Sequence, residues 1–154
     1  MSGTETIAPV VRADLAPVRQ GYSDEEYVAL YALAREFLAT GDLPSAERIA
    51  RGLVALQPRF SSAWMIQAYI ALMREDLSQA IHFAREALKH DSTMCEALLC
   101  LVIAYFNLED YQSGGTYLGE VSDLIDGRKV SPELRNVYQS QMARFQLRLG
   151  RKAV

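Results

Sequence analysis

Apolar residues recur at intervals of three and four along most of this chain of 154 residues, which is the spacing of amphipathic helices. Ser23 followed by Glu26 forms a capping-box pattern that starts the first helix. Ser131 followed by Pro132 starts the last one, because proline is favoured at the first helical position. No stretch alternates with period two. The pattern predicts an all-α protein with seven main helices and no sheet.

The middle of the chain is built from three units of 34 residues. Their boundaries fall at residues 27–60, 61–94 and 95–128. Position four of each unit holds a large apolar residue: Leu30, Trp64 and Leu98. Position twenty holds a small one, which lets two helices approach closely: Ala46, Ala80 and Gly114. The turn between the helices reads Gly41-Asp42-Leu43, Glu75-Asp76-Leu77 and Glu109-Asp110-Tyr111.

These residues resemble the tetratricopeptide repeat (TPR) family, whose helix–turn–helix units have this period and stack into a solenoid. The resemblance implies an α-solenoid of three TPR helix pairs plus a C-terminal capping helix over residues 131–149, in a single domain over 23–150. Leu134, Tyr138, Met142, Phe145 and Leu149 give that last helix its apolar face. Residues 1–22 contain Pro9 and Pro17 and no sustained period, so we expect a flexible N-terminal extension.

Charge is distributed unevenly along the chain. Residues 23–126 carry 16 acidic and 7 basic side chains, a net charge of −9, whereas residues 127–154 carry 7 basic and 1 acidic, a net charge of +6. Acidic repeats without a basic stripe argue against nucleic acid as a partner. The basic segment suits either the C-terminal end of a solvated helix or, less well, a phosphate site.

The chain offers few groups for chemistry. Cys95 and Cys100 are five apart, which is neither a redox nor a zinc spacing, so we expect reduced thiols packed as small apolar groups. His82 and His90 have no ligand at a recognisable interval, and phosphate-loop and nucleophile motifs are absent. We therefore expect no metal, no cofactor and no enzymatic activity. With neither a secretory signal nor a run of about 18 apolar residues, the chain is expected to be cytoplasmic, without a membrane partner.

Three glycines, Gly114, Gly115 and Gly119, fall inside one predicted helix. Each costs about 0.5–1 kcal/mol relative to alanine in a helix interior. They indicate either close packing against the terminal helix or a segment that loosens to admit a partner, and the first interpretation is favoured.

In TPR proteins the first helix of each pair lines a concave groove. Carried over to this chain, the groove positions are mostly apolar, although Ser62 and Glu96 also fall among them. They lack the basic side chains with which some family members bind acidic chaperone C-termini. The pattern favours a protein or peptide client with hydrophobic anchors, unless residues 7–18 of the chain itself cover the groove. The predicted contact residues are Tyr31, Arg35, Leu38, Met65, Tyr69, Leu72, Leu99, Ile103 and Phe106, with Tyr69 and Leu99 expected to face solvent.

Two segments are similar to the type III secretion translocator chaperones. They are SDEEYVALYALAREFLATGDLPSAERIA, with its acidic start, tyrosine-rich helix and glycine turn, and YIALMREDLSQAIHFAREAL. The resemblance implies a bacterial cytosolic chaperone that keeps a hydrophobic secreted client soluble, and a homodimer formed through the N-terminal segment, residues 7–26. The alternatives are a structural adaptor inside a multiprotein complex and, more remotely, an accessory subunit of an enzyme.

Overall fold

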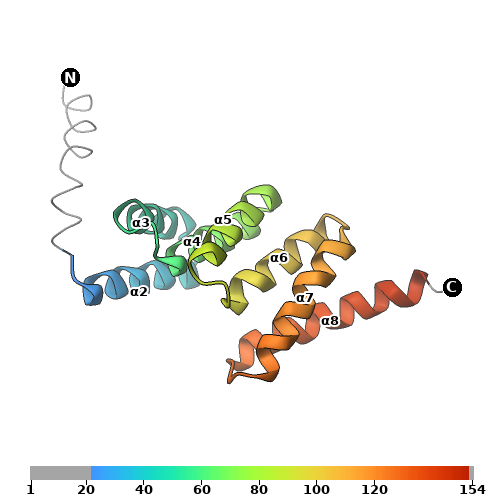
Figure 1. Cartoon of the computed structure of the whole chain (residues 1–154). Helices are drawn as coiled ribbons and strands as arrows, with labels where there is room; N and C mark the ends of the chain where they lie inside the picture. Colours follow the sequence, from blue (N-terminus) through green and yellow to red (C-terminus); the bar gives the residue numbers. More distant parts are fainter. Residues whose placement is uncertain (1–21, 153–154) are drawn as a thin grey trace.

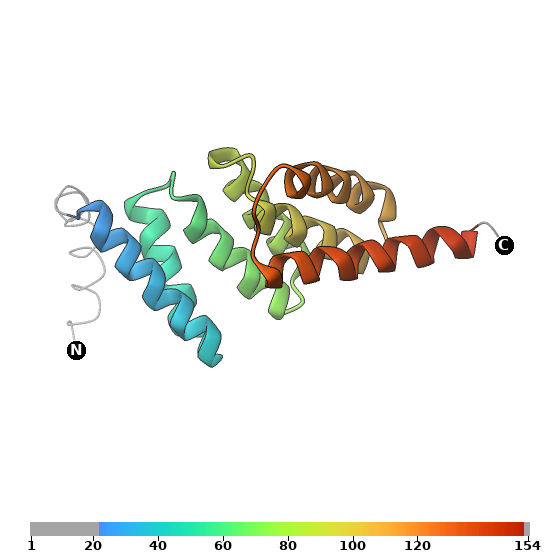
Figure 2. The same cartoon turned by 90° about the horizontal axis from the view of Figure 1, so that it is seen from below.

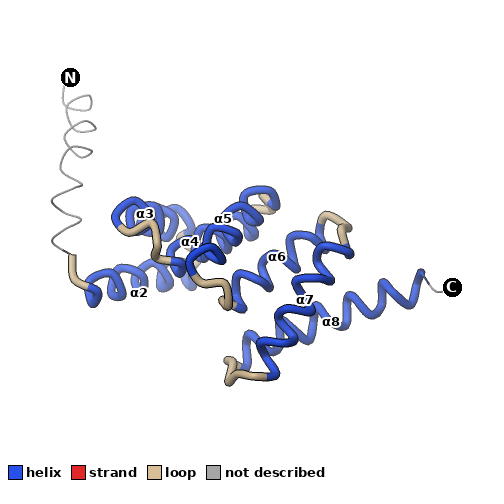
Figure 3. The backbone as a smooth tube through the Cα atoms, viewed as in Figure 1, coloured by secondary structure: helices blue, strands red, loops and turns tan. Residues whose placement is uncertain are grey.

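The computed structural model describes residues 22–152, and these form seven α-helices and no strand (Figures 1 and 3). The helices are α2 (Asp24–Thr40), α3 (Leu43–Leu56), α4 (Ser61–Met73), α5 (Leu77–His90), α6 (Cys95–Asn107), α7 (Tyr111–Asp126) and α8 (Pro132–Lys152). The predicted all-α class is confirmed for this part of the chain. The expected flexible extension lies outside the described residues except for Tyr22.

Consecutive helices form the three predicted pairs, α2 with α3, α4 with α5, and α6 with α7 (Figure 1). Each pair packs on the next, and α8 packs on both α6 and α7. The result is a solenoid with α2 at one end and α8 at the other (Figure 2). The capping helix begins where the sequence predicts, with Ser131 Oγ accepting from the Leu134 amide at 3.2 Å, and it ends at Lys152 rather than at residue 149.

The turn inside each pair has one backbone design, repeated three times. One residue of the turn is left-handed in each repeat: Gly41 with φ 84°, Glu75 with φ 60° and Glu109 with φ 62°. The aspartate that follows caps the second helix, as Asp42, Asp76 and Asp110 accept hydrogen bonds from the amides of Ser45, Gln79 and Ser113. A left-handed residue and a side-chain cap together satisfy groups that a helix end leaves unpaired, so the two helices meet through a very short connection.

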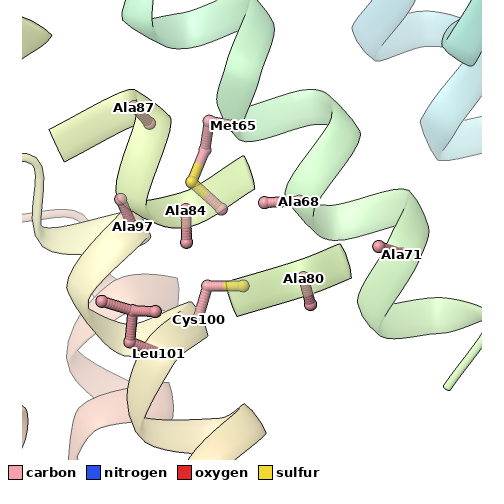
Figure 4. Close-up of a cluster of buried hydrophobic side chains, with 9 residues drawn as sticks. All are labelled: Met65, Ala68, Ala71, Ala80, Ala84, Ala87, Ala97, Cys100 and Leu101. Atoms are coloured by element: carbon pink, nitrogen blue, oxygen red, sulfur yellow. The ribbon is translucent and has the colours of Figure 1, made fainter. Parts of the chain in front are cut away.

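Small residues fill the core between the pairs. Ala46 and Ala80, both at position twenty, have no exposed surface. Figure 4 shows one core cluster, in which the alanines of α4 and α5 surround Met65 and Cys100. Cys95 and Cys100 are free and buried, as predicted. Methyl-sized side chains let the helix axes approach closely.

The glycines of α7 are explained by close packing in two cases out of three. A methyl group on Gly114 would lie 2.4 Å from Cδ1 of Phe106 on α6, and one on Gly115 would lie 2.8 Å from Cζ of Phe145 on α8. A methyl group on Gly119 would meet nothing within 4 Å. Two aromatic rings therefore occupy the space that side chains on α7 would need. Packing against the terminal helix is supported for Gly115, whereas Gly114 packs against α6 instead.

This difference predicts opposite effects of the same substitution on one helix. Gly114→Ala should lower the free energy of unfolding by roughly 1–3 kcal/mol, because the added methyl overpacks against a buried ring. Gly119→Ala should raise it by about 0.5–1 kcal/mol through helix propensity alone. Denaturant unfolding followed by circular dichroism measures both values. An unchanged stability in Gly114→Ala would mean that the ring of Phe106 moves aside at no cost.

Candidate functional site

A small cavity opens between the first helices of the three pairs. Its volume is about 160 Å³. By comparison, an apolar cavity of about 150 Å³ accepts benzene. The residues around it come from α2, from α4 and from the start of α6, and four of them belong to the predicted contact set. We call this cavity the groove pocket; it is lined by Tyr31, Arg35, Ser62, Met65, Tyr69, Met94 and Glu96.

Helical spacing brings the predicted residues together. Tyr31 and Arg35 are four apart on α2, and Met65 and Tyr69 are four apart on α4, so each pair shares one face of its helix. The Tyr31 ring packs edge-on against Phe60, with ring centres 5.7 Å apart. The guanidinium of Arg35 lies 6.0 Å from the centre of the Tyr31 ring. Without a partner, Tyr31 therefore already contacts both Phe60 and Arg35.

The pocket combines an apolar floor with a charged rim. Met65 is 4% exposed, whereas Arg35 and Glu96 are exposed and carry opposite charges. Glu96 lies in the first turn of α6, where a carboxylate interacts favourably with the helix dipole. An apolar anchor side chain would contact the floor, and the rim groups would meet its polar backbone.

Tyr69 is the most perturbed group of the pocket. Burial raises the pKa of its phenol to about 12, and the negative charge of Glu96 acts in the same direction, whereas Arg35 opposes both. The hydroxyl is therefore neutral at physiological pH. Within residues 22–152 it forms no hydrogen bond, so it is available to a bound partner.

The remaining predicted contact residues lie elsewhere. Leu38, Leu72 and Ile103 are half-buried but do not line the pocket. Leu99 is 2% exposed, and Phe106 has no exposed surface. The expectation that Leu99 faces solvent is therefore wrong.

The capping helix explains the burial of Leu99 and Phe106. Leu99 belongs to a cluster that Leu134 and Tyr138 of α8 cover. Phe106 stacks on Phe145 of α8, with ring centres 5.7 Å apart. The third repeat has the same positions as the first two. However, the next element in the stack is the single helix α8, whereas each earlier repeat is followed by another helix pair.

Residues outside the predicted set complete the pocket. Ser62 and Glu96 line the pocket and occupy groove positions of the repeat, but they are not among the predicted contact residues. Met94 precedes α6 in the turn between pairs, and the periodicity of the first helices carries no signal for it. The described residues contain no group of three or more histidine, cysteine or acidic side chains placed to hold a metal ion. Over the same range, each helix is too short or too polar to cross a bilayer.

Comparison with known proteins places this arrangement in a known fold. No protein-family model and no curated protein matches the chain. The translocator chaperone SycD of Yersinia enterocolitica superposes with a TM-score of 0.74 and 17% identity, over 82% of this chain and 96% of SycD. The chain has the fold of the type III secretion translocator chaperones.

Two further structures support the same assignment. PcrH, in complex with the chaperone-binding region of PopD, superposes with a TM-score of 0.73 and 16% identity, over 86% of this chain and 97% of PcrH. The Sgt2 TPR domain of Aspergillus fumigatus gives a TM-score of 0.66 and 15% identity, over 79% of this chain and 80% of that domain. Both resemblances inferred from the sequence are thus confirmed at the level of fold. These neighbours are chaperones and protein-binding TPR domains, not enzymes.

The raised pKa values predict how stability changes with pH. Tyr69 and Cys100 both keep their protons to about pH 12 when folded, because burial disfavours their charged forms. In the unfolded chain they ionise near their ordinary values of 10.0 and 9.0, so above these values the unfolded state binds fewer protons. The contribution of these two groups to stability should therefore be constant below about pH 9 and fall as the pH rises further.

Tyr69→Phe isolates the contribution of the phenol. Between about pH 9 and about pH 11 the wild type should lose roughly 1 kcal/mol more than this variant, as measured by urea unfolding. Equal losses in the two proteins would show that the folded state lets Tyr69 ionise freely.

Proposed function

We propose that this protein is a chaperone that holds a hydrophobic segment of a secreted protein client on the face formed by its first helices, with the groove pocket receiving one anchor side chain. The observation that carries the proposal is the convergence of Tyr31, Arg35, Met65 and Tyr69 on one cavity of about 160 Å³. Each comes from a position that lines the groove in TPR proteins. Because these side chains surround an open cavity, residues 22–152 leave room for a ligand group there. Residues 7–18, the segment that the sequence offers as an alternative cover, lie outside the described residues.

The complexes of the structural neighbours point to the kind of client. SycD has been seen in complex with a peptide of the translocator YopD, and PcrH with the chaperone-binding region of PopD. By analogy, the client here is a translocator protein of a type III secretion system, bound in the bacterial cytosol before export. A homodimer in the manner of the SycD dimers belongs to the same hypothesis.

The size of the pocket limits what one contact can achieve. Burying a single large apolar side chain contributes about 1.5–3 kcal/mol. A dissociation constant of about 1 μM requires a net 8.2 kcal/mol, after the cost of association. Stable holding of a client therefore needs further contacts along the same face, and the half-buried Leu38, Leu72 and Ile103 are the side chains we propose for them.

A variant that fills the pocket tests the proposal. Ser62 is half-buried and lines the cavity, so the ring of Ser62→Phe should occupy the space of the anchor. When the protein is co-expressed with the hydrophobic translocator encoded by the same genome, the wild type should keep that translocator in the soluble fraction. Ser62→Phe should lose this activity while its melting temperature and helicity are retained. A substitution at Leu99 would be a poor probe, because Leu99 is buried in the core.

Ser92→Phe is the matched control, because Ser92 is exposed in the turn between the second and third pairs and does not line the pocket. This control should keep the translocator soluble. If the wild type fails to do so, the chaperone hypothesis is wrong and the structural adaptor becomes the better one. If Ser62→Phe and Ser92→Phe behave alike, the client binds elsewhere on the molecule.

Client binding should depend little on salt. The pocket floor is apolar, and its two rim charges are exposed and therefore already screened. Raising the salt concentration from about 50 mM to about 500 mM should change the affinity measured by calorimetry less than tenfold. A collapse of affinity over this range would show that ion pairs, and not anchors, hold the client.

A further inference from the structure

We propose that a basic hollow beside the last turns of α8 binds an acidic segment of a partner protein, separately from the groove pocket. The hollow has a volume of about 460 Å³, and its walls come from the turn between α6 and α7, from the start of α7 and from α8. The groove pocket touches the start of α6, near Met94 and Glu96, whereas this hollow lies at the other end of that helix, and the two sites share no residue. We call it the arginine hollow, after Arg144, Arg148 and Arg151.

The three arginines lie on one side of α8, because their numbers follow the helical spacing of four and three. Arg144 is tied to the rest of the fold. Its guanidinium donates to Oδ1 of Asn107 at 2.9 Å and to the carbonyl oxygen of Phe106 at 3.0 Å. These bonds hold α8 on the end of α6, so Arg144 is a positioning residue. Arg148 and Arg151 remain available to a ligand.

Arg148 is held by an aromatic contact, but its donors are not used. Its guanidinium lies 5.2 Å from the centre of the Tyr111 ring, and that ring stacks on Phe106 with centres 4.9 Å apart. Among residues 22–152 the buried Nε of Arg148 has no hydrogen-bond partner. A buried donor without an acceptor costs free energy, and a ligand oxygen would remove that cost.

The charges of the hollow are unequal. Three guanidiniums share it with one carboxylate, that of Glu109. Within the described part of the chain, neither Glu109 nor any of the three arginines forms an ion pair. The hollow therefore keeps an excess of positive charge. Repulsion from Glu109 directs the acidic groups of a ligand towards Arg148 and Arg151.

The shape of these groups indicates the class of ligand. A guanidinium presents a planar pair of donors that matches the two oxygens of a carboxylate, and it can do so while its face stacks on an aromatic ring. Leu147, which is 68% exposed, lines the same hollow and offers an apolar contact beside the charges. The complementary ligand is a peptide segment in which glutamate or aspartate flanks an apolar side chain.

An anionic membrane surface fits these observations less well. A helix that lies on a membrane buries a continuous apolar face in it. In α8 that face packs on α6 and α7 through Leu134, Tyr138, Met142 and Phe145. A peptide can enter a hollow with an acidic residue at its rim, whereas a flat anionic surface would meet that residue first.

Fluorescence anisotropy with the full-length protein tests the proposal. The probe is a short fluorescein-labelled peptide in which glutamates flank a leucine, and the control probe has glutamine in place of each glutamate. The wild type should bind the first peptide and not the second. Its affinity should fall at least about tenfold between about 50 mM and about 500 mM salt, in contrast to binding in the groove pocket. Ser62→Phe should bind the acidic peptide as the wild type does, so this test does not depend on the proposed chaperone function.

Substitutions in the hollow should change the affinity in opposite directions. Arg148→Gln should weaken binding about tenfold or more. Arg148→Lys should not restore it, because an ammonium keeps the charge but lacks the planar pair of donors. Arg151→Gln should weaken binding about two- to fivefold, and Glu109→Gln should strengthen it by a similar factor. The matched control is Arg135→Gln, which removes the same charge from an exposed position at the other end of α8 and should bind as the wild type does.

The melting temperature of each variant is measured alongside. Arg151 is exposed, so Arg151→Gln tests the hollow even if Arg148→Gln loosens the contact with Tyr111.

Four outcomes would overturn the proposal. The first is a wild type that does not bind the acidic peptide at about 1 mM. The second is a loss of affinity in Arg135→Gln as large as in the hollow variants, which would mean that diffuse charge attracts the peptide. The third is full affinity in Arg148→Lys, which would mean that charge alone is sufficient. The fourth is binding to phosphatidylglycerol vesicles that the arginine variants lose, without peptide binding, which would make the hollow a membrane contact.

Discussion

The close approach of two helices at position twenty of each repeat is the constraint on which the rest of the structure depends. Ala46 and Ala80 are completely buried there, and at Gly114 the ring of Phe106 occupies the space that even a methyl group would need. The two closely packed helices are joined by the left-handed turn residue and the aspartate that caps the second helix. Position twenty also contacts the next pair, since Ala46 lies in one cluster with Ile66 of α4 and Ala80 in another with Ala97 of α6.

The terminal helix decides which part of that face is available. Because α8 packs on both α6 and α7, it covers Leu99 and Phe106 and leaves the opening between α2 and α4. The candidate site is consequently off centre, towards the first two repeats. Beyond Phe145, α8 has little left to cover, and its last turns expose leucines that an inner helix would bury.

Most of the fold follows from the sequence, because the same two helices, turn and small residue recur in all three repeats. The helix pairs, the caps at Ser23 and Ser131 and the buried thiols could all be predicted in this way. The site could be predicted only in part. A repeat pattern shows which helix face a residue occupies, but the burial of Leu99 depends on what packs against the third repeat, and Met94 lies in a turn that the helical period does not reach.

The repeated turn has a consequence for how this protein could change over time. Its left-handed position is glycine in the first repeat but glutamate, at φ 60° and 62°, in the other two. A side chain with a Cβ adopts this conformation at a cost that glycine does not incur. In the second and third repeats, replacing this glutamate with glycine should therefore raise the free energy of unfolding. A lineage that acquired a destabilising change around the groove pocket would have two mutations able to offset it, at positions that do not line that pocket.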